Sequence, residues 1–115
     1  MSRFALLGAL LLASGCRHLE THYAALAGPG SPPQGPAAAT ELHLDRLPTR
    51  TFRELGLVQA IGYGSDGDEV HVLAALRDEG QRRGCEAVVR VHVDRGQGAC
   101  HAIGVCVQWA TPDVP

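Results

Sequence analysis

Four cysteines are the residues of this chain best suited to chemistry, and the first of them stands apart from the rest. Cys16 follows a short positive start, Met1–Arg3, an uncharged apolar run, Phe4–Ala13, and two small residues, Ser14 and Gly15. This order is typical of a secretory signal peptide with its cleavage site. The apolar run is too short to cross a bilayer as a helix, which takes about 20 residues. We therefore expect export, with residues 1–15 as the signal peptide.

The residues Ala13-Ser14-Gly15-Cys16 resemble a bacterial lipobox. In that family the cysteine sulfur receives a diacylglyceryl group, the peptide is cut before it, and Leu is usual where Ala13 stands. The resemblance implies lipidation of Cys16 and a firm membrane anchor, since two or more acyl chains hold stably where one does not. Arg17, in place of the Asp that retains enterobacterial lipoproteins at the inner membrane, favours the periplasmic face of the outer membrane. The alternative is an ordinary signal peptide with an incidental cysteine.

The other three cysteines, Cys85, Cys100 and Cys106, suit an oxidising compartment, but their odd number leaves at least one thiol unpaired within a monomer. Along one extended strand Cys100 and Cys106 would lie about 20 Å apart, whereas a disulfide needs a Cα separation of about 4.4–6.8 Å. They could pair only if the chain near Cys100 folds back. The alternatives are Cys100–Cys106, Cys85–Cys106, Cys85–Cys100 or three thiols, and we favour the first or the last.

A metal site is the competing use of these side chains. Cys100, Cys106, His92 and His101 are good zinc or copper ligands. However, Cys100 and His101 are adjacent and would point to opposite sides of a strand, and the sequence has no Cys-x-x-Cys spacing. His18 and His22 would share one face of a short helix, but two histidines alone make a poor site. No cofactor is implied by the sequence.

Composition bounds the remaining possibilities. The chain has 115 residues, which leaves room for one small exported domain, and its formal charge is −2. All ten basic residues are Arg, and they form no basic stripe with aromatic residues, so nucleic-acid binding has no support. Ser65 and His71 lack the surroundings of a catalytic nucleophile. We expect a protein that is not an enzyme.

The pattern of residues predicts a tether followed by a domain. The segment Gly28–Ala39 is rich in Pro, Gly and Ala and cannot build a core, so we expect residues 16–40 to be a tether, with a turn or two of helix in Arg17–Ala27. Residues 41–115 should form a small α+β domain with one helix packed on a mostly antiparallel sheet of 3–4 strands, in the order β-α-β-β. The expected strands are Glu41–Asp45, Leu57–Tyr63, Glu86–Asp94 and Cys100–Trp109.

The helix should begin with Asp66 as N-cap, with Glu69 completing a capping box, and should end at Gly84. Its apolar face would comprise Val70, Leu73, Ala74 and Leu76. The charged residues near its end, among them Glu79 and Arg83, would face solvent. In the final hairpin, odd residues should pair with odd ones, which places Cys100 and Cys106 on the face away from Val105 and Val107. A glycine within a strand often marks a bulge, and Gly104 is such a position.

Several short segments together resemble the outer-membrane stress-sensing lipoprotein family of the Rcs phosphorelay. They are Phe52-Arg53-Glu54-Leu55-Gly56-Leu57-Val58, Ala87-Val88-Val89, Gly98-Ala99-Cys100 and Val105-Cys106-Val107. The resemblance implies a tethered α+β domain that engages outer-membrane proteins and reports envelope damage. That family has two disulfides; Cys100 and Cys106 match one member of each, but Tyr63 and Val93 stand near the expected partners. The helix followed by Gly84–Val89 is also similar to a wider group of small YbjQ-like α+β domains.

The sequence therefore predicts an outer-membrane lipoprotein that is not an enzyme and presents a periplasmic interaction domain, with envelope stress sensing as its role. Its partners would be the membrane, through the lipid, and outer-membrane or periplasmic proteins. The alternative is a periplasmic metal- or redox-responsive module that uses Cys100, Cys106, His92 and His101.

Overall fold

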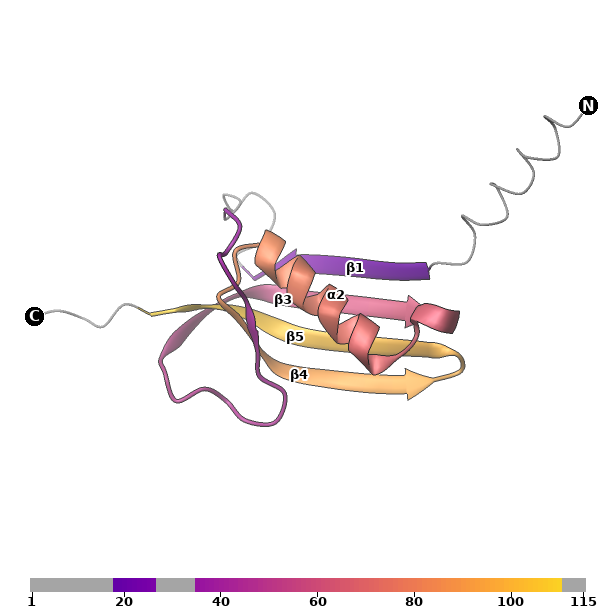
Figure 1. The fold of residues 1–115 in the computed structure, drawn as a ribbon. Coiled ribbons are helices and arrows are strands. Elements are labelled where there is room, and N and C mark those ends of the chain that lie inside the picture. The colour runs from indigo at the N-terminus through magenta and orange to yellow at the C-terminus, as the bar shows by residue number, and fades with distance from the viewer. Residues whose placement is uncertain (1–17, 27–34, 111–115) are drawn as a thin grey trace, which may run out of the picture.

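The computed structural model describes residues 18–26 and 35–110, and these form one α+β unit with a single helix on a mixed sheet (Figure 1). Cys16 and most of the Pro-rich segment lie outside the described residues. The strands are β1 (His18–Ala25), β2 (Glu41–Leu42), β3 (Phe52–Tyr63), β4 (Ala87–Gly96) and β5 (Ala99–Trp109). A short 3₁₀ turn, η1 (Gly64–Asp66), precedes the helix α2 (Glu69–Arg82). The expected α+β class with one helix is confirmed.

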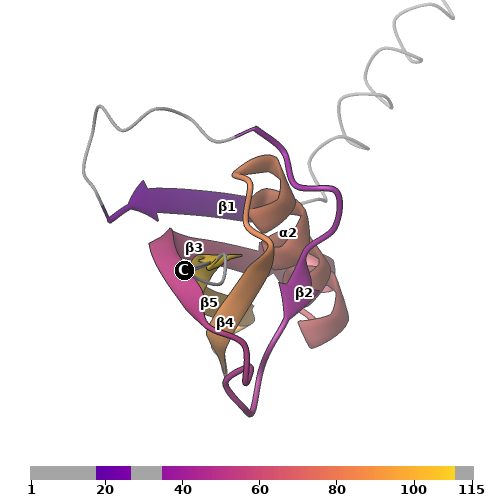
Figure 2. The same cartoon turned by 90° about the vertical axis from the view of Figure 1, so that its left-hand side faces the viewer.

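The five strands lie in the order β1-β3-β5-β4-β2, so the sheet is larger than the 3–4 strands that the sequence predicts. The pairs β1–β3, β3–β5 and β5–β4 are antiparallel, whereas the two-residue β2 runs parallel to β4. Helix α2 lies across one face of this sheet (Figure 2). The other face carries no helix in the part of the chain that the structure describes.

The main departure from expectation is β1. Residues 18–25 fall in the range expected as tether, for which the sequence allows a turn or two of helix, but they form a strand instead. They pair along their whole length with β3, from His18 opposite Tyr63 to Ala25 opposite Gly56. Leu19, Thr21, Tyr23 and Ala25 alternate with His18, Glu20, His22 and Ala24, which is the period of a strand. Pairing with β3 selects this period over the helical one.

The described end of the Pro-rich segment is also held against the domain. The backbone N–H of Ala37 donates to Gln81 O at 3.0 Å, and the Gln81 side chain donates to Ala37 O and Ala38 O at 3.3 Å each. Thr40 is buried, and its hydroxyl donates to Cys85 O at 2.7 Å. These contacts fix residues 37–40 beside the C-terminal end of α2, ahead of the expected domain start at residue 41.

Helix α2 begins two residues later than predicted. The N-cap is Asp68, whose side chain accepts from the backbone N–H of His71 at 2.8 Å, and the expected Asp66 lies in η1. The predicted stop at Gly84 is confirmed, since its φ of 81° is one that Gly adopts readily. The buried face is as predicted only in part: Leu76 is buried and Leu73 packs against the core, whereas Val70 is 77% exposed. The other buried residues of the helix are Val72, Ala75, Glu79 and Gly80.

A bulge in β4 changes which side chains face the helix. Val89 pairs with Val105 but His92 pairs with Ile103, so β4 has one extra residue here, and Arg90 adopts a φ of 52°. Odd residues of β4 pair with odd residues of β5, as predicted, only before the bulge. The bulge lies opposite Gly104, where a Cβ would come within 2.5 Å of Val88 Cγ1. The prediction of a bulge near Gly104 is confirmed, although the extra residue lies in the neighbouring strand.

Two apolar clusters result, one on each side of the sheet. The larger lies under α2 and joins Val58, Ala60, Val72 and Leu76 to Val88, Val91, Cys100, Ala102 and Cys106. The smaller lies on the other side at one end of the sheet and comprises Ala87, Val89 and Val107, packed by Phe52, Val105 and Trp109. No helix among the described residues is both long and apolar enough to cross a membrane.

Candidate functional site

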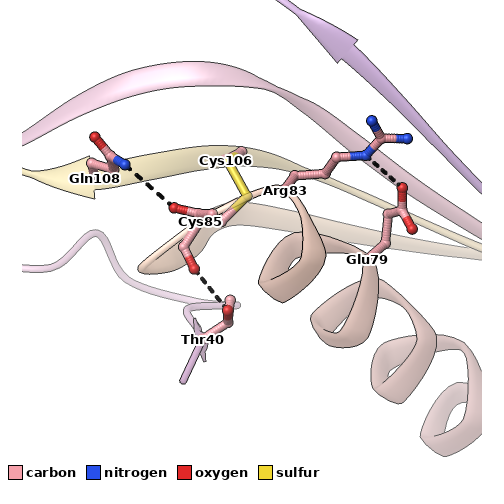
Figure 3. The surroundings of a disulfide bond; sticks show 7 residues. Thr40, Glu79, Arg83, Cys85, Cys106 and Gln108 are labelled. Atoms are coloured by element: carbon pink, nitrogen blue, oxygen red, sulfur yellow. Dashed lines mark hydrogen bonds and ion pairs between the residues drawn. A yellow bond between two sulfur atoms is a disulfide. The ribbon is translucent and has the colours of Figure 1, made fainter. Parts of the chain in front are cut away.

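Cys85, Cys100 and Cys106 all belong to the larger apolar core, and two of them are bonded. Cys85 and Cys106 form a disulfide with a Cα separation of 5.2 Å (Figure 3). This was one of the open alternatives, and the favoured ones, Cys100–Cys106 or three thiols, are wrong. Cys85 directly follows the Gly84 stop, so the chain leaves α2 beside the middle of the sheet. The bond therefore ties the end of the helix to β5.

Cys100 is the free cysteine of the described residues and is completely buried in the larger core. It lies on the same face as Cys106, as the predicted parity of β5 requires. Cys100 and Cys106 are six residues apart on one continuous strand, so they cannot bond to each other. Cys85, at the end of the helix, bonds to Cys106 instead.

The structure does not bring the alternative metal ligands together. Cys106 is in the disulfide, Cys100 is buried under α2, and His92 and His101 are exposed on the opposite face. His101 follows Cys100 directly, so strand alternation sends the two side chains to opposite sides. Within residues 18–26 and 35–110 no group of three or more His, Cys, Asp or Glu side chains is placed to hold a metal ion.

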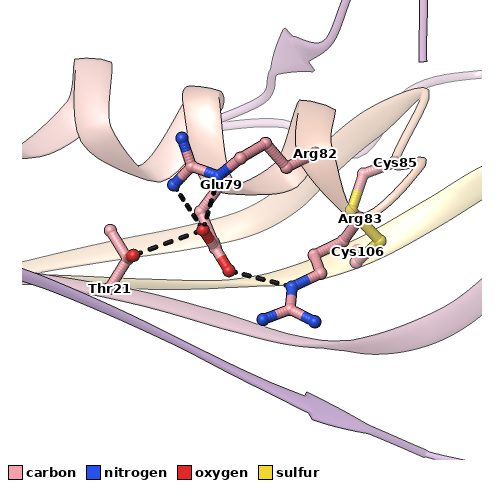
Figure 4. A network of polar contacts seen from close by, with 6 residues as sticks. All are labelled: Thr21, Glu79, Arg82, Arg83, Cys85 and Cys106. Carbon is pink, nitrogen blue, oxygen red and sulfur yellow. Dashed lines mark hydrogen bonds and ion pairs between the residues drawn. A yellow bond between two sulfur atoms is a disulfide. The ribbon is translucent and has the colours of Figure 1, made fainter. Parts of the chain in front are cut away.

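A polar network that the sequence analysis missed joins α2 to β1. Glu79, expected to face solvent, has a side chain only 6% exposed. Its Oε2 accepts from Arg82 Nε at 3.1 Å and from Thr21 Oγ1 at 3.3 Å, and its Oε1 accepts from Arg83 Nε at 2.9 Å (Figure 4). Burial acts to raise the pKa of Glu79, but the hydrogen bonds and charges of Arg82 and Arg83 outweigh it, so this pKa lies below its ordinary value.

The same helix end holds a second residue of β1. The guanidinium of Arg83 lies 5.1 Å from the centre of the Tyr23 ring, which is a cation–π distance. Burial raises the pKa of the Tyr23 phenol, and the positive charge of Arg83 opposes that shift. The edge strand is thus fixed to α2 by two side chains, Thr21 and Tyr23, that face the helix.

The helix-free face of the sheet carries the exposed functional groups. The register gives one row across the strands of His22, Gln59, Ile103 and His92, and a second of Glu20, Ile61, His101 and Asp94. His18 and Tyr63 pair at the end of the same face, with ring centres 4.6 Å apart. Four of the six histidines of the chain therefore share this face.

The arrangement on this face is an apolar centre between polar edges. Leu57 and Ile103 are about two-fifths exposed, at 40% and 39%. On β1, Glu20 lies 3.0 Å from His18 Nε2 and 3.6 Å from His22 Nε2. On β4, His92 Nε2 lies 3.3 Å from Asp94. We call the apolar residues Leu57, Ile61, Tyr63 and Ile103, with the histidines and acids beside them, the open face.

The rest of the helix-free side is covered or forms a separate groove. His43 and Arg50 come from the segment between β2 and β3. The centre of the His43 ring lies 6.3 Å from the centre of the Trp109 ring, and Arg50 Cζ lies 4.8 Å from it. A groove of about 490 Å³ lies beside Trp109 and is lined by Gly35–Ala39, Glu41, Gly84, Glu86 and Gln108. Glu86 Oε2 accepts from the Trp109 backbone N–H at 2.8 Å, and Gln108 donates to Gly84 O, so these polar groups are already engaged.

Sequence reasoning found His92 and His101 but not the residues beside them. His18, Glu20 and His22 were assigned to a tether, and a signal that could have placed them was the alternation of residues 18–25. Glu79 is missed because a charged residue is expected to face solvent, whereas here Thr21, Arg82 and Arg83 satisfy its buried carboxylate. Cys16, the predicted lipidation site, lies outside the described residues. No family model matches this chain, and no curated protein or solved structure matches it either.

Proposed function

We propose that this protein is an outer-membrane lipoprotein that is anchored through Cys16 and presents the open face of its sheet to a protein of the periplasm or outer membrane. The observation that carries this proposal is the position of β1. Only Arg17 separates Cys16 from His18, the first residue of the sheet. A lipid on Cys16 would therefore hold the sheet itself close to the membrane surface, and not at the end of a long tether.

The Pro-rich segment has a different role in this proposal. It follows β1 and precedes β2, so it connects one edge strand of the sheet to the other. With β1 in place, the distance from the anchor to the domain is set by one or two residues, at most about 3.5 Å each. One edge of the open face is formed by His18, Glu20 and His22 of β1. The open face would then stay near the bilayer.

The chemistry of the open face suits contact with another protein. Its apolar centre offers area to bury, and its histidines and carboxylates offer hydrogen bonds and charge at the rim, which is the usual anatomy of an interface. The resemblance to the Rcs sensor lipoproteins supports envelope stress sensing as the role of that contact.

The anchor is tested with the variant Cys16→Ser in a bacterial host. We expect it to leave the membrane fraction or to keep its signal peptide, and we expect the wild-type mass to include the lipid. Unchanged fractionation together with an unlipidated wild-type mass would refute the anchor.

The surface is tested with a photo-reactive residue placed at Ile103, on the open face, and at Val70, which is 77% exposed on α2. We expect one defined envelope protein to cross-link from position 103 and not from position 70, and Leu57→Asp to abolish that cross-link. The same products from both positions, or none from position 103 with the anchor intact, would count against the proposal.

A further inference from the structure

The outer edge of β1 is open. In the described part of the chain β1 pairs on one side only, with β3. Natural sheets protect such an edge with Lys, Pro, a bulge or a very short strand. The eight residues of β1 contain neither Lys nor Pro, and their pairing with β3 shows no register shift. The edge is therefore available for pairing with another strand.

The direction of the free backbone groups follows from the ladder. The N–H of Leu26 donates to Leu55 O at 3.0 Å, which continues the register of β1 and makes 26 and 55 a hydrogen-bonded pair. Because such pairs alternate along antiparallel strands, the even residues of β1 bond to β3. The N–H and C=O groups of Leu19, Thr21, Tyr23 and Ala25 point away from β3, toward the open edge.

We propose that β1 pairs with β1 of a second copy of this chain, antiparallel and centred on Thr21, to form one continuous sheet across a two-fold axis. In this register Thr21 lies opposite Thr21 of the second copy, and Leu19 lies opposite its Tyr23. All of these are residues with outward-pointing groups, so the two edges would exchange about six backbone hydrogen bonds.

The polar side chains that face each other across the axis select this register from its neighbours. Centring on Thr21 places Glu20 of each copy opposite His22 of the other copy. Both of these pairs lie on the side of the open face. Centring on Glu20 would oppose two carboxylates, and centring on His22 would oppose two imidazoles. An imidazole N–H opposite a carboxylate can donate a hydrogen bond across the strand pair, whereas two carboxylates directly opposite each other destabilise it. Leu19, which is 43% exposed in one copy, gains an aromatic neighbour only in the favoured register.

This inference goes beyond the proposed function and does not depend on lipidation. It is also compatible with it, because the axis sets the two His18 residues six positions apart along the paired strands, or about 20 Å. Two anchors at that separation could enter the same membrane surface.

The test uses the full chain in detergent, with its mass measured by light scattering over a range of protein concentrations. Thr21→Pro removes one outward N–H and leaves the β1–β3 bonds, since Pro is accepted in edge strands where the N–H faces solvent. Thr21→Val is the matched control, because it also loses the hydroxyl bond to Glu79 but keeps the N–H. We expect wild type and Thr21→Val to dimerise, and Thr21→Pro to be a folded monomer.

A charge exchange tests the register. Glu20→Lys alone removes the carboxylate acceptor opposite His22, and His22→Glu alone opposes two carboxylates; each should weaken dimerisation about tenfold. The double variant restores opposite charges and should recover it. Exchange of the amides of Leu19, Thr21 and Tyr23 with deuterium should slow on dimerisation.

Three results would overturn the proposal. They are a wild-type chain that stays monomeric at every concentration, a dimer that survives Thr21→Pro, and a dimer that Thr21→Val disrupts as strongly as Thr21→Pro. Protection of the β1 amides by a different protein, with no self-association, would assign the edge to that partner instead.

Discussion

Thr21 and Glu79 are 58 residues apart in the sequence, yet the hydroxyl of Thr21 donates to Oε2 of Glu79 at 3.3 Å. The same carboxylate accepts from Arg82 and Arg83 on its own helix. One side chain therefore holds the first strand of the sheet and orders the end of α2. The position of β1, on which both proposals depend, is set partly at this carboxylate.

Replacing Glu79 should destabilise the fold. Glu79→Gln removes the negative charge that pairs with two guanidinium groups. It also places an amide N–H₂ donor beside the N–H donors of those groups. Breaking a buried ion pair costs several kcal/mol, but Arg82 and Arg83 are 61% and 50% exposed, so we expect about 1–2 kcal/mol. Urea unfolding measures this loss. Glu54→Gln is the control, because Glu54 pairs with Arg90 at the surface, and it should cost less than about 0.5 kcal/mol. Equal losses would show that Glu79 has no special role.

The lowered pKa of Glu79 gives its contribution a pH dependence of known sign. A carboxyl whose pKa is lower in the folded state binds fewer protons there than in the unfolded chain. Its stabilisation is complete above the ordinary value of 4.5 and is lost as the pH falls through the lower folded pKa. We expect the difference in unfolding free energy between wild type and Glu79→Gln to be constant from pH 7 to about pH 5 and to shrink below it. A difference that grows on acidification would contradict this sign.

The disulfide should contribute about 3 kcal/mol, the entropy expected for closing a loop between residues separated by 21 positions. The variant with both Cys85 and Cys106 changed to Ala should unfold at correspondingly lower urea concentration. Cys100→Ala is the control, since it changes a buried cysteine without opening a loop, and reducing agent should destabilise this control as it does wild type. Thiol counting under denaturing, non-reducing conditions should find Cys100 reactive and Cys85 and Cys106 unreactive. Labelling of Cys85 or Cys106 in that assay would show that the bond is absent.

Gly62 is required by a close backbone approach. A Cβ at this position would come within 2.1 Å of Asp66 O and 2.8 Å of Val72 Cγ2. Gly62→Ala should force η1 and α2 away from β3 and cost about 1–3 kcal/mol. Gly96→Ala is the matched control, because its Cβ would meet nothing within 4 Å. Thermal unfolding of the two variants should separate them clearly, and equal melting temperatures would contradict the packing of η1 over Gly62.

The folded unit should need β1. A chain that begins at residue 41 lacks β1 and also Thr40, which is buried and bonded to Cys85 O. It would leave the β3 edge unpaired and would remove the Thr21 hydroxyl from the Glu79 carboxylate, so we expect it to exchange its β3 amides much faster than a chain that begins at residue 17. Similar protection in the two chains would restore the domain boundary that the sequence suggests.

Local signals in the sequence determined α2, its stop at Gly84 and the three long strands. These depend on the repeat of apolar residues and on glycine at special backbone positions, which neighbouring residues fix by themselves. The sequence points to a bulge near Gly104, and one lies there, but in β4, while Gly104 itself leaves room for the Val88 side chain. The expected face of α2 is wrong in part: Leu76 is buried and Leu73 packs against the core, but Val70 is exposed. The buried face instead includes Glu79, whose carboxylate is satisfied by Arg82 and Arg83.

Tertiary structure alone decided the partners. Residues 18–25 allow a helix or a strand, and the free edge of β3, the Glu79 carboxylate and the Arg83 guanidinium make the strand the better choice. Likewise Cys106 could bond to several partners by sequence, but the chain leaves α2 at Gly84 with Cys85 beside it. The lipobox around Cys16 remains a prediction from sequence. The fold adds that an edge strand of the sheet begins at His18, two positions after Cys16.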